Sequence, residues 1–454
     1  MSDVIAAIST PLMSAGLGVI RISGDNAAEI ADLVFRSVSG KKLNEINGYS
    51  ALYGHVFDKK GDIDEVVALN FRAPHSFTGE NAVELSCHGS VYILKRTLAA
   101  LIAAGARLAR AGEFTRRAFE NGKMDLSAAE SVMSLIGAQS ELEHSAALSG
   151  REGVLFRRID EIKGELTALS AHLSAWVDFP DEDVPEVSHD ELYDGLKSAK
   201  NRLSRLISDF DNGKILREGI DTVIVGRPNV GKSTFMNMLC GADRSIVTDI
   251  AGTTRDIVEE SVSVGGIKLR LQDTAGLHET VDRVEKFGVD MARRRIESAA
   301  LVLAVFDGSE PLNDDDLALI EALKGRRAIA VINKSDLDMK IDIERIASVI
   351  EKTVILSAKS GENADMVEAA ILSVSGLDGL DPTSAMMTTE RQRDCAERAF
   401  AAINEGISAL DLGLTFDAVG VLLDEAIAAL CELSGERVSD SIVDEVFDTF
   451  CVGK

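Results

Sequence analysis

The chain is poor in several features that mark particular classes of protein. Its five cysteines are scattered, with no CxxC pair and no spacing typical of a metal site. This pattern fits a reducing cytoplasm better than a disulfide framework. The first residues, MSDVIAAISTP, lack the basic segment and apolar core of a signal peptide, and no apolar run reaches membrane-spanning length. The sequence therefore predicts a soluble cytoplasmic protein without a membrane contact.

Basic residues are also scarce relative to acidic ones. Lys and Arg number 48 against 74 Asp and Glu, which gives a formal net charge of −26. Because phosphates repel such a chain, it is a poor general binder of nucleic acid, and any RNA contact needs a local basic patch. The best candidate patch consists of Arg107, Arg110, Arg116, Arg117 and Lys123. An ordinary solvated surface is an equally good interpretation of these five residues.

Length and apolar content allow several domains. The chain has 454 residues, of which 46% are hydrophobic, enough for about three domains with full cores. Residues 1–120 alternate between strand-like and helix-like segments, which predicts a compact α/β or α+β domain. The expected strands cover 18–23, 48–57, 65–71 and 82–89, and the expected helices cover 25–38 and 91–104.

From Leu126 onward the pattern becomes helical. Apolar residues recur at alternating spacings of four and three between Leu155 and Trp176, which predicts one long helix with an apolar seam. Prolines and acidic residues in DFPDEDVPEV then end it. Further helices are expected at 190–213, 390–410 and 415–433, on both sides of a central segment. The simplest packing joins them into one bundle, whose arrangement a nucleotide bound in the central segment could change.

The central segment begins with a phosphate-binding loop. Residues 226–234 read GRPNVGKST, in which the glycines let successive backbone N–H groups face phosphates. Lys232 supplies a point charge for the β- and γ-phosphates, and the Ser233 hydroxyl suits Mg²⁺. An apolar strand at 222–225 precedes the loop and a helix opens at 235–239, which is the context that this motif needs.

Further motifs follow in the order typical of GTPases. Asp273 and Gly276 in LQDTAG suit a Mg²⁺-bound water and the γ-phosphate. Asp336 in NKSD can accept two N–H bonds from guanine, and Asn333 and Lys334 brace its loop. SAKSG at 357–361 is similar to the loop that contacts the base in such GTPases. A protein that binds GTP without hydrolysing it is the alternative. The predicted GTP contacts are Asn229, Val230, Gly231, Lys232, Ser233, Thr234, Thr248, Asp249, Ile250, Ala251, Gly252, Thr253, Thr254, Asp273, Thr274, Ala275, Gly276, Asn333, Lys334, Asp336, Ser357, Ala358 and Lys359.

One residue common in GTPases is missing. The position after DTAG, where many GTPases place a glutamine that orients water, holds Leu277. A monovalent cation at Asn229, completed by the 246–256 segment, could do the electrostatic work of an arginine finger. Glu285 could orient the attacking water instead, although the charged stretch at 282–286 alone favours a solvated helix face.

Stretches along the whole chain carry a family resemblance. They include GVIRISG, SFTGENAVELSCHG, GEFTRRAFENGKMDL, DFPDEDVP, LREGI, TDIAGTTRD and the ending FCVGK. With these motifs the chain resembles the MnmE (TrmE) family of GTPases that modify the wobble uridine of tRNA. A GTP-dependent scaffold without modification chemistry, as in ribosome assembly, is the alternative.

The resemblance implies a fold and a set of partners. It implies a folate-binding α/β domain at 1–121, a discontinuous helical domain at 122–216 and 379–454, and an inserted Ras-like P-loop GTPase at 217–378. It also implies a homodimer through the N-terminal domain and a heterotetramer with the flavoprotein MnmG (GidA), which uses FAD and NADH. The reaction on tRNA adds an aminomethyl or carboxymethylaminomethyl group at uridine carbon 5. The one-carbon unit would come from 5-formyl- or 5,10-methylene-tetrahydrofolate.

Site residues carry over from the resemblance as well. Glu285 falls on the family's catalytic glutamate. Cys451 is either a nucleophile or a small residue packed near the folate pocket. Two departures from the family pattern, the glycine-poor segment STPLMSAGLG and Cys87, leave the shape of that pocket open. The implied ligands are Arg21, Glu84, Lys123 and Lys454 for folate, Ser233 and Thr254 for Mg²⁺, and Asn229, Thr248, Ile250 and Thr253 for K⁺.

Overall fold

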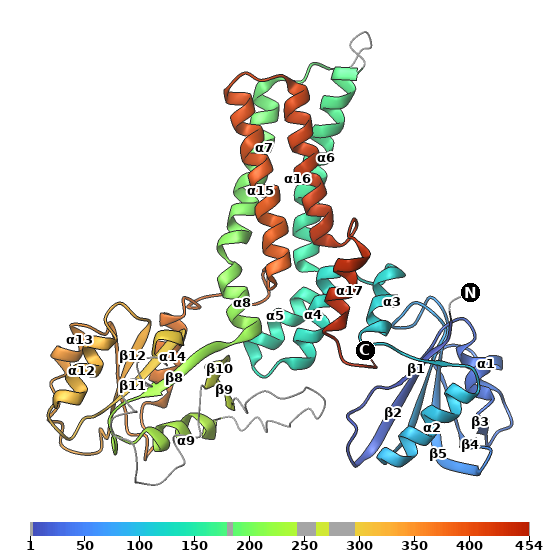
Figure 1. Ribbon diagram of the computed structural model, residues 1–454, viewed down its shortest axis with the longest axis horizontal. Coiled ribbons are helices and arrows are strands. Elements are labelled where there is room, and N and C mark those ends of the chain that lie inside the picture. The colour runs from blue at the N-terminus through green and yellow to red at the C-terminus, as the bar shows by residue number, and fades with distance from the viewer. Residues whose placement is uncertain (1–2, 179–184, 243–259, 272–295, 454) are drawn as a thin grey trace.

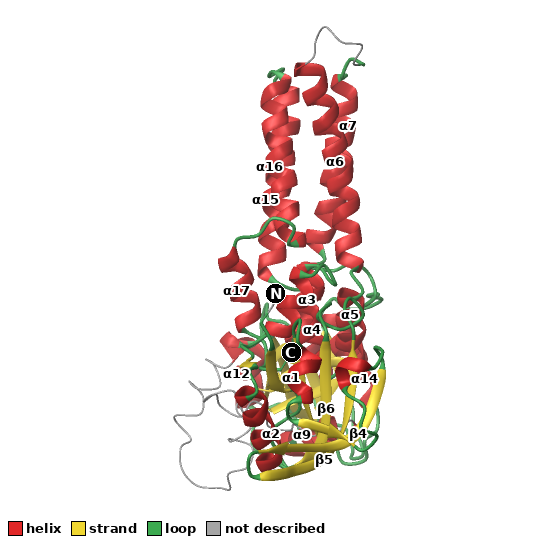
Figure 2. Cartoon of the chain, turned by 90° about the vertical axis from the view of Figure 1, so that its right-hand side faces the viewer, coloured by secondary structure: helices red, strands yellow, loops and turns green. Residues whose placement is uncertain are grey.

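A computed structural model describes residues 3–178, 185–242, 260–271 and 296–453 (Figure 1). An upright bundle of long helices stands on a base that carries two lobes, each built around a β-sheet. The side view in Figure 2 shows how far the bundle rises above both sheets. No helix in the described ranges has the length and apolar character to cross a bilayer.

The N-terminal lobe contains a mainly antiparallel sheet with strand order β3-β4-β5-β6-β2-β1-β7. Alternate residues of its strands point to one face, where Ile20, Val66 and Leu85 are buried under α1 and α2. On the opposite face α3 buries Phe114 against Ile5. The elements are β1 (Ile5–Ile8), β2 (Ala15–Ser23), α1 (Ala27–Asp32), β3 (Phe35–Ser37), η1 (Leu43–Glu45), β4 (Ser50–Asp58), β5 (Gly61–Phe71), β6 (Ala82–Gly89), α2 (Val91–Ala103), β7 (Arg107–Leu108) and α3 (Glu113–Glu120).

The helix predicted over 25–38 is wrong in its second half. The chain leaves the helix after Asp32, and β3 pairs Phe35 with Val56 of β4. Phe35 and Val34 are buried in the same core as α1. Long-range strand pairing therefore overrides the local helical pattern. The four strands predicted in this lobe and the helix at 91–104 are confirmed, with bounds that differ by at most four residues.

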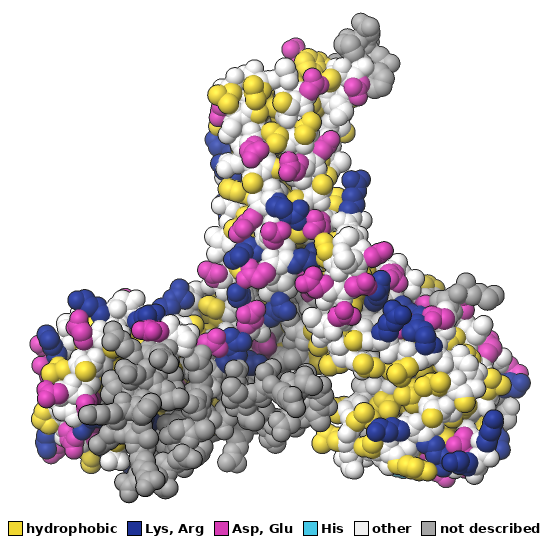
Figure 3. Space-filling model, in the orientation of Figure 1, with side chains coloured by type: hydrophobic (Ala, Val, Ile, Leu, Met, Phe, Trp, Pro, Cys, Tyr) yellow, Lys and Arg dark blue, Asp and Glu magenta, His cyan; other side chains and the backbone are white. Residues whose placement is uncertain are grey.

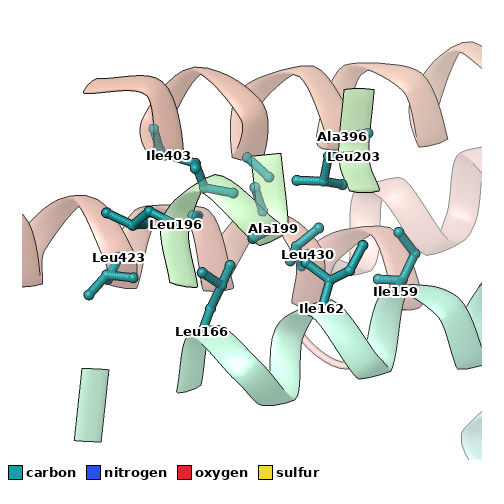
Figure 4. Close-up of a cluster of buried hydrophobic side chains, with 14 of the residues drawn as sticks. Ile159, Ile162, Leu166, Leu196, Ala199, Leu203, Ala396, Ile403, Leu423 and Leu430 are labelled. Atoms are coloured by element: carbon teal, nitrogen blue, oxygen red, sulfur yellow. The ribbon is translucent and has the colours of Figure 1, made fainter. Parts of the chain in front are cut away.

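The bundle consists of α6 (Val154–Asp178), α7 (His189–Ser208), α15 (Glu390–Asp411) and α16 (Phe416–Ser434). Figure 4 shows side chains from all of them pointing toward one another, including Ile162, Leu203, Ile403 and Leu430. The predicted apolar seam of α6 is confirmed, because it faces this core along most of its length. Each fully buried Leu or Ile contributes about 1.5–3 kcal/mol. The core draws on residues 155–210 and 387–433, so chain segments far apart in sequence stabilise one another.

The single helix predicted over 190–213 is interrupted. The chain turns at Asp209, where α7 ends and α8 (Phe210–Glu218) begins. The turn places Phe210 in the bundle core and directs Leu216 into the core of the other lobe. Shorter helices complete the base of the bundle: α4 (Leu126–Gly137), α5 (Glu141–Arg151) and α17 (Asp440–Asp448).

The second lobe contains a sheet with strand order β13-β12-β11-β8-β10-β9, parallel except for β9. The order reverses at β8, and in such sheets ligands bind beyond the carboxyl ends of the strands at the reversal. Both faces of the sheet are buried, which explains its continuous apolar strands. Its elements are β8 (Ile220–Val225), α9 (Lys232–Ala242), β9 (Glu260–Val264), β10 (Ile267–Leu271), β11 (Leu301–Asp307), α12 (Asp314–Ala322), β12 (Ala328–Asn333), α13 (Ile343–Ala347), β13 (Lys352–Ile355) and α14 (Ala364–Val374).

A buried ion pair ties α4 to the start of α15. Glu130 accepts hydrogen bonds from Arg391 at 2.9 and 3.0 Å and from Gln392 at 2.6 Å. The Glu130 and Arg391 side chains are only 9% and 16% exposed. Arg391 also donates to the carbonyls of Glu432 and Leu433 at the end of α16. One guanidinium therefore joins three helices at the base of the bundle.

We expect Glu130→Ala to destabilise the bundle by about 3–5 kcal/mol, because it leaves Arg391 buried without its countercharge. Trp176, the only tryptophan, packs against the bundle core, so its fluorescence in urea reports the unfolding of this part. Glu161→Ala is the matched control, since Glu161 pairs with Arg202 but is 54% exposed, and it should cost at most about 1 kcal/mol. Equal losses in the two variants would contradict the assigned role of Glu130.

Candidate functional site

The loop after β8 requires glycine at two positions. Gly226 has φ +150°, and a Cβ there would lie 2.3 Å from the Val305 carbonyl oxygen. Gly231 has φ +96°, and its Cβ would lie 2.3 Å from Asn333 Nδ2. Any larger residue would push the loop off both neighbours. Asn229 between them has φ +67°, a left-handed conformation that asparagine tolerates better than most residues, and its side chain is exposed.

Lys232 begins helix α9 and closes the loop. Its ammonium group donates hydrogen bonds to the carbonyls of Gly226 at 2.7 Å and Arg227 at 2.8 Å. Burial lowers the pKa of this ammonium group. Ser233 and Thr234 follow in the first turn and are exposed. The loop thus places a lysine at the N-terminus of helix α9, which is the arrangement that binds phosphate.

Asn333 connects this loop to a second one at the end of β13. Its Nδ2 donates to the Val230 carbonyl at 2.8 Å, and its Oδ1 accepts from the Ala358 N–H at 2.9 Å. Asp336 is exposed, and the Ser357 hydroxyl donates to its carboxylate at 2.7 Å, which lowers the pKa of Asp336. The structure therefore presents an oriented, ionised carboxylate beside the phosphate loop.

Asp307, at the end of β11, was not singled out by sequence reasoning. It is 5% exposed and accepts a hydrogen bond from Lys334. Burial alone would raise its pKa, but the hydrogen bonds from Lys334 and Ser309 outweigh burial and the pKa falls. Lys334 is held in a left-handed conformation at φ +68°. Residues 305–309 read VFDGS and lie at the carboxyl end of a buried strand. That position was the sequence signal that could have identified Asp307.

Many predicted nucleotide contacts cannot be placed. Thr248, Asp249, Ile250, Ala251, Gly252, Thr253, Thr254, Asp273, Thr274, Ala275, Gly276 and Glu285 lie outside the described residues, as do Leu277 and Lys454.

Arg21 and Glu84 lie side by side on adjacent strands. They are cross-strand partners of β2 and β6, and the guanidinium contacts the Glu84 carboxylate at 2.9 Å through Nε and 2.8 Å through Nη2. The Phe77 and Phe114 rings lie 5.5 and 5.7 Å from the guanidinium carbon, close enough for cation–π attraction. Arg21 Nη1 is buried with no hydrogen-bond partner among the described residues. A buried donor of this kind indicates a missing acceptor.

Lys123 approaches the same region through the loop at 74–80. Its ammonium group donates to the Pro74 carbonyl at 3.0 Å, and its side chain packs against Gly79. Phe77, in the same loop, is one of the two aromatic residues that pack on Arg21. The loop therefore contacts two of the four residues predicted to bind folate, Lys123 and Arg21.

The C-terminal tail returns to the N-terminal lobe. The Ser9 hydroxyl donates to the Gly453 carbonyl at 3.2 Å, and the Gly112 N–H donates to the Cys451 carbonyl at 3.4 Å. Val452 forms an isolated bridge with Ala111. The Cys451 side chain is exposed. This exposure does not decide between its two predicted roles.

The predicted basic patch is largely neutralised. Arg107 pairs with Asp3 and Glu113, and Arg116 pairs with Glu120 and Asp444. Arg117 is buried among three carboxylates, while Arg110 is exposed. The ordinary-surface interpretation is therefore the better one. In the described residues, no group of His, Cys, Asp and Glu side chains has the arrangement of a metal site.

Two family models together match most of the chain. Residues 4–123 match the N-terminus of the GTP-binding protein TrmE, and residues 126–451 match the MnmE helical domain. The chain belongs to the MnmE family. The tRNA modification GTPase MnmE of Alkaliphilus metalliredigens is 40% identical over 459 residues, covering 100% of both chains. The protein of the same name from Clostridioides difficile is 38% identical over 457 residues, again covering 100% of both.

Solved structures add little to this family assignment. The G domain of the T. maritima FeoB iron transporter is one of the similar solved structures. The match covers 34% of this MnmE-family chain and 98% of the FeoB chain, at 24% sequence identity and a TM-score of 0.26. That likeness is too low to carry an argument. The assignment rests on the full-length MnmE relatives and the family models.

One departure from the MnmE pattern lies in the core of the N-terminal lobe. Cys87 lies one residue from His88 on β6, but its side chain is buried with Leu85 in the core under α2. Burial raises the pKa of this thiol to about 12. Glu84 lies on the opposite face of the strand, so Cys87 does not alter the face that carries Arg21.

Proposed function

We propose that this chain is a K⁺-stimulated GTPase of tRNA modification. With the flavoprotein MnmG (GidA), which carries FAD and uses NADH, it adds an aminomethyl or carboxymethylaminomethyl group at carbon 5 of the wobble uridine. The one-carbon unit comes from 5-formyl- or 5,10-methylene-tetrahydrofolate. One observation carries the greatest weight: the Nη1 donor of Arg21 is buried and has no hydrogen-bond partner among the described residues. This donor lies beside Glu84, in the lobe that also holds the C-terminal tail.

The nucleotide part of the proposal assigns a role to each group of residues. The Lys232 ammonium and the loop N–H groups hold the phosphates, and the Asp336 carboxylate accepts the N–H groups of guanine. Ser233 and Thr254 hold Mg²⁺, which would neutralise phosphate charge. Asn229, Thr248, Ile250 and Thr253 hold K⁺, and Glu285 orients the attacking water. The exposed, left-handed Asn229 suits a cation ligand because its amide oxygen is not used within the loop's described contacts.

The folate part rests on the chemistry of the donor set. Arg21 Nη1 needs an acceptor, which a pterin carbonyl or a glutamyl carboxylate can supply. The Glu84 carboxylate accepts N–H groups of the pterin edge. Lys123 and Lys454 suit the glutamyl tail, and Cys451 is the candidate nucleophile of the neighbouring tail. Phe77 is half-buried, so its ring also offers an apolar surface to a flat ligand.

The proposed assembly is a homodimer through the N-terminal domain, joined by MnmG into a heterotetramer. The sheet face that carries Arg21 also exposes Leu17 at 68%, Tyr53 at 53% and Val67 at 44%, and hydrophobic side chains cover much of this lobe in Figure 3. Exposed apolar area of this kind is typical of an interface.

We assign residues 1–121 to the dimerising domain, 122–216 with 379–454 to the helical domain, and 217–378 to the GTPase domain.

The Arg21→Gln variant tests the folate part. We expect the purified variant to lose most tetrahydrofolate binding, because a neutral amide cannot hold both Glu84 and a ligand acceptor, while its GTP hydrolysis stays normal. Cells whose only copy carries Arg21→Gln should lack the modified wobble uridine in their tRNA nucleosides. Arg36→Gln is the control, since Arg36 pairs with Asp62 on the surface and is 65% exposed. Unchanged wobble uridines in cells lacking the protein would favour the scaffold alternative instead.

A further inference from the structure

The hairpin formed by β9 and β10 contacts the corner between α4 and α5. The Ser261 hydroxyl donates to Gln139 Oε1 at 2.9 Å. A Cβ at Gly266, in the hairpin turn, would lie 3.1 Å from the Leu142 side chain, so the turn packs directly on α5. Leu142 packs against the core of the GTPase lobe, although it belongs to α5. We call these residues the hairpin–α5 contact.

The α5 side of this contact is stiff. Ser140 caps the helix by accepting from the Glu143 N–H, and Glu143 accepts from the Gln139 N–H at 2.7 Å. Glu143 is 5% exposed, and burial raises its pKa, although the positive charge of Lys268 on β10 opposes this rise. Such reciprocal capping fixes the corner. We therefore expect a displacement of the hairpin to move α5 without bending the corner.

A second connection between the lobe and the bundle is tighter. A Cβ at Gly213 of α8 would lie 2.2 Å from the Met387 carbonyl oxygen. Arg217 donates to the Thr388 carbonyl at 3.2 Å, and Lys214 pairs with Glu390 at 2.8 Å. The two chain crossings between lobe and bundle are thus bound to each other and form one pivot. The hairpin–α5 contact combines one side-chain hydrogen bond with the packing of Leu142, and it lies on a different helix from this pivot.

The hairpin also has a special place in the sequence. Its first strand continues the segment that carries IVTDIAGTTRD, and its second strand leads directly into DTAGL. Both segments hold proposed GTP contacts. From this position and its packing we infer that the hairpin–α5 contact transmits nucleotide state from the GTPase lobe to the helices. The inference rests on the proposed nucleotide function. From α5 the route continues to α4, whose Glu130 is paired with Arg391 of the bundle.

A pair of double variants tests this inference. Gln139→Lys with Ser261→Lys places like charges across the contact, whereas Gln139→Glu with Ser261→Lys places opposite charges there; both positions lie at the surface. The readouts are hydrogen exchange of residues 141–151 with GDP or a non-hydrolysable GTP analogue, GTP hydrolysis by the full-length protein, and modified uridine in cells. We expect nucleotide-dependent exchange in the wild type and in the opposite-charge variant. The like-charge variant should lose it and modify tRNA at least about fivefold less per GTP hydrolysed.

Four outcomes separate the possible failures. Exchange in α5 that is equal with both nucleotides in the wild type, although both bind, would overturn the inference. Normal modification by the like-charge variant would overturn it as well. By contrast, a wild-type protein that neither binds nor hydrolyses GTP would refute the proposed function itself. Failure of both double variants, with loss of GTP hydrolysis, would show that the contact serves folding and not signalling, which also contradicts the inference.

Discussion

Replacing Asp336 by asparagine is expected to change the preferred base from guanine to xanthine. The Asp336 carboxylate is exposed and held by the Ser357 hydroxyl at 2.7 Å, so both of its acceptor positions are oriented before a base arrives. Guanine donates two N–H groups to such a carboxylate. Asparagine offers one acceptor and one donor, which matches the carbonyl that xanthine carries in place of the amino group of guanine.

The expected size of this change follows from charge-assisted hydrogen bonds. Each is worth about 1.5–3 kcal/mol, so losing two lowers GTP affinity by about 10²- to 10⁴-fold. Affinity for xanthosine triphosphate should rise in the same variant. Titration of both nucleotides measures the two changes. Asp338→Asn is the control, because Asp338 is exposed two residues further along the chain and should leave both affinities unchanged. An Asp336→Asn protein that keeps its GTP affinity would remove this residue from base recognition.

The nucleotide loops could be predicted because their requirements are local. The loop holds Gly226 and Gly231 at positive φ, which the glycine pattern signals locally, although the atoms of Val305 and Asn333 that also exclude a side chain there belong to distant strands. The helices of the bundle were equally readable, since the apolar seam of α6 repeats with the helical period. Thr389 and Gln392 form a capping box at the start of α15, which places that helix start within the expected residues.

Other features depend on contacts between distant parts of the chain. β3 forms because Phe35 pairs with β4 and enters the core, whereas its local sequence continues a helical pattern. Glu130 and Arg391 are 261 residues apart, and Ser9 and Gly453 are 444 apart. Neither pairing leaves a local signal. The paired state of Arg107 and Arg117 is of the same kind, which is why the basic patch could not be decided from the sequence.

The same contrast holds within the site. Arg21 and Glu84 were assigned by resemblance alone, and as single residues each fits a surface role. The structure brings them together because antiparallel register makes them cross-strand partners. The unpartnered Nη1 among the described residues is information of a different type, since no sequence pattern reports whether a donor is satisfied. It adds to an assignment by resemblance the observation that one donor beside Glu84 has no hydrogen-bond partner among the described residues.

Turnover of GTP is expected to be about 10²-fold faster in K⁺ than in Na⁺, the size of effect that a single fixed electrostatic group has on a developing anion. The reason is that the sequence lacks the glutamine that orients water in many GTPases. Leu277 stands at that position and cannot orient water. Asn229 is exposed in the phosphate loop at φ +67°, where its amide oxygen can face a cation next to the phosphates. The measurement is kcat in matched chloride salts at constant ionic strength.

Two substitutions at Asn229 separate the side chain from the backbone. Asn229→Ala removes the oxygen but also strains a left-handed backbone, whereas Asn229→Gly removes the oxygen and keeps that conformation at no steric cost. If the amide oxygen holds the cation, both variants lose the difference between K⁺ and Na⁺ while glycine preserves GTP affinity. Loss in the alanine variant alone would mean that the backbone conformation matters and not the oxygen. Equal wild-type rates in the two salts would mean that the protein's own side chains carry out hydrolysis without a cation. Glu285 would then be the first residue to test by substitution.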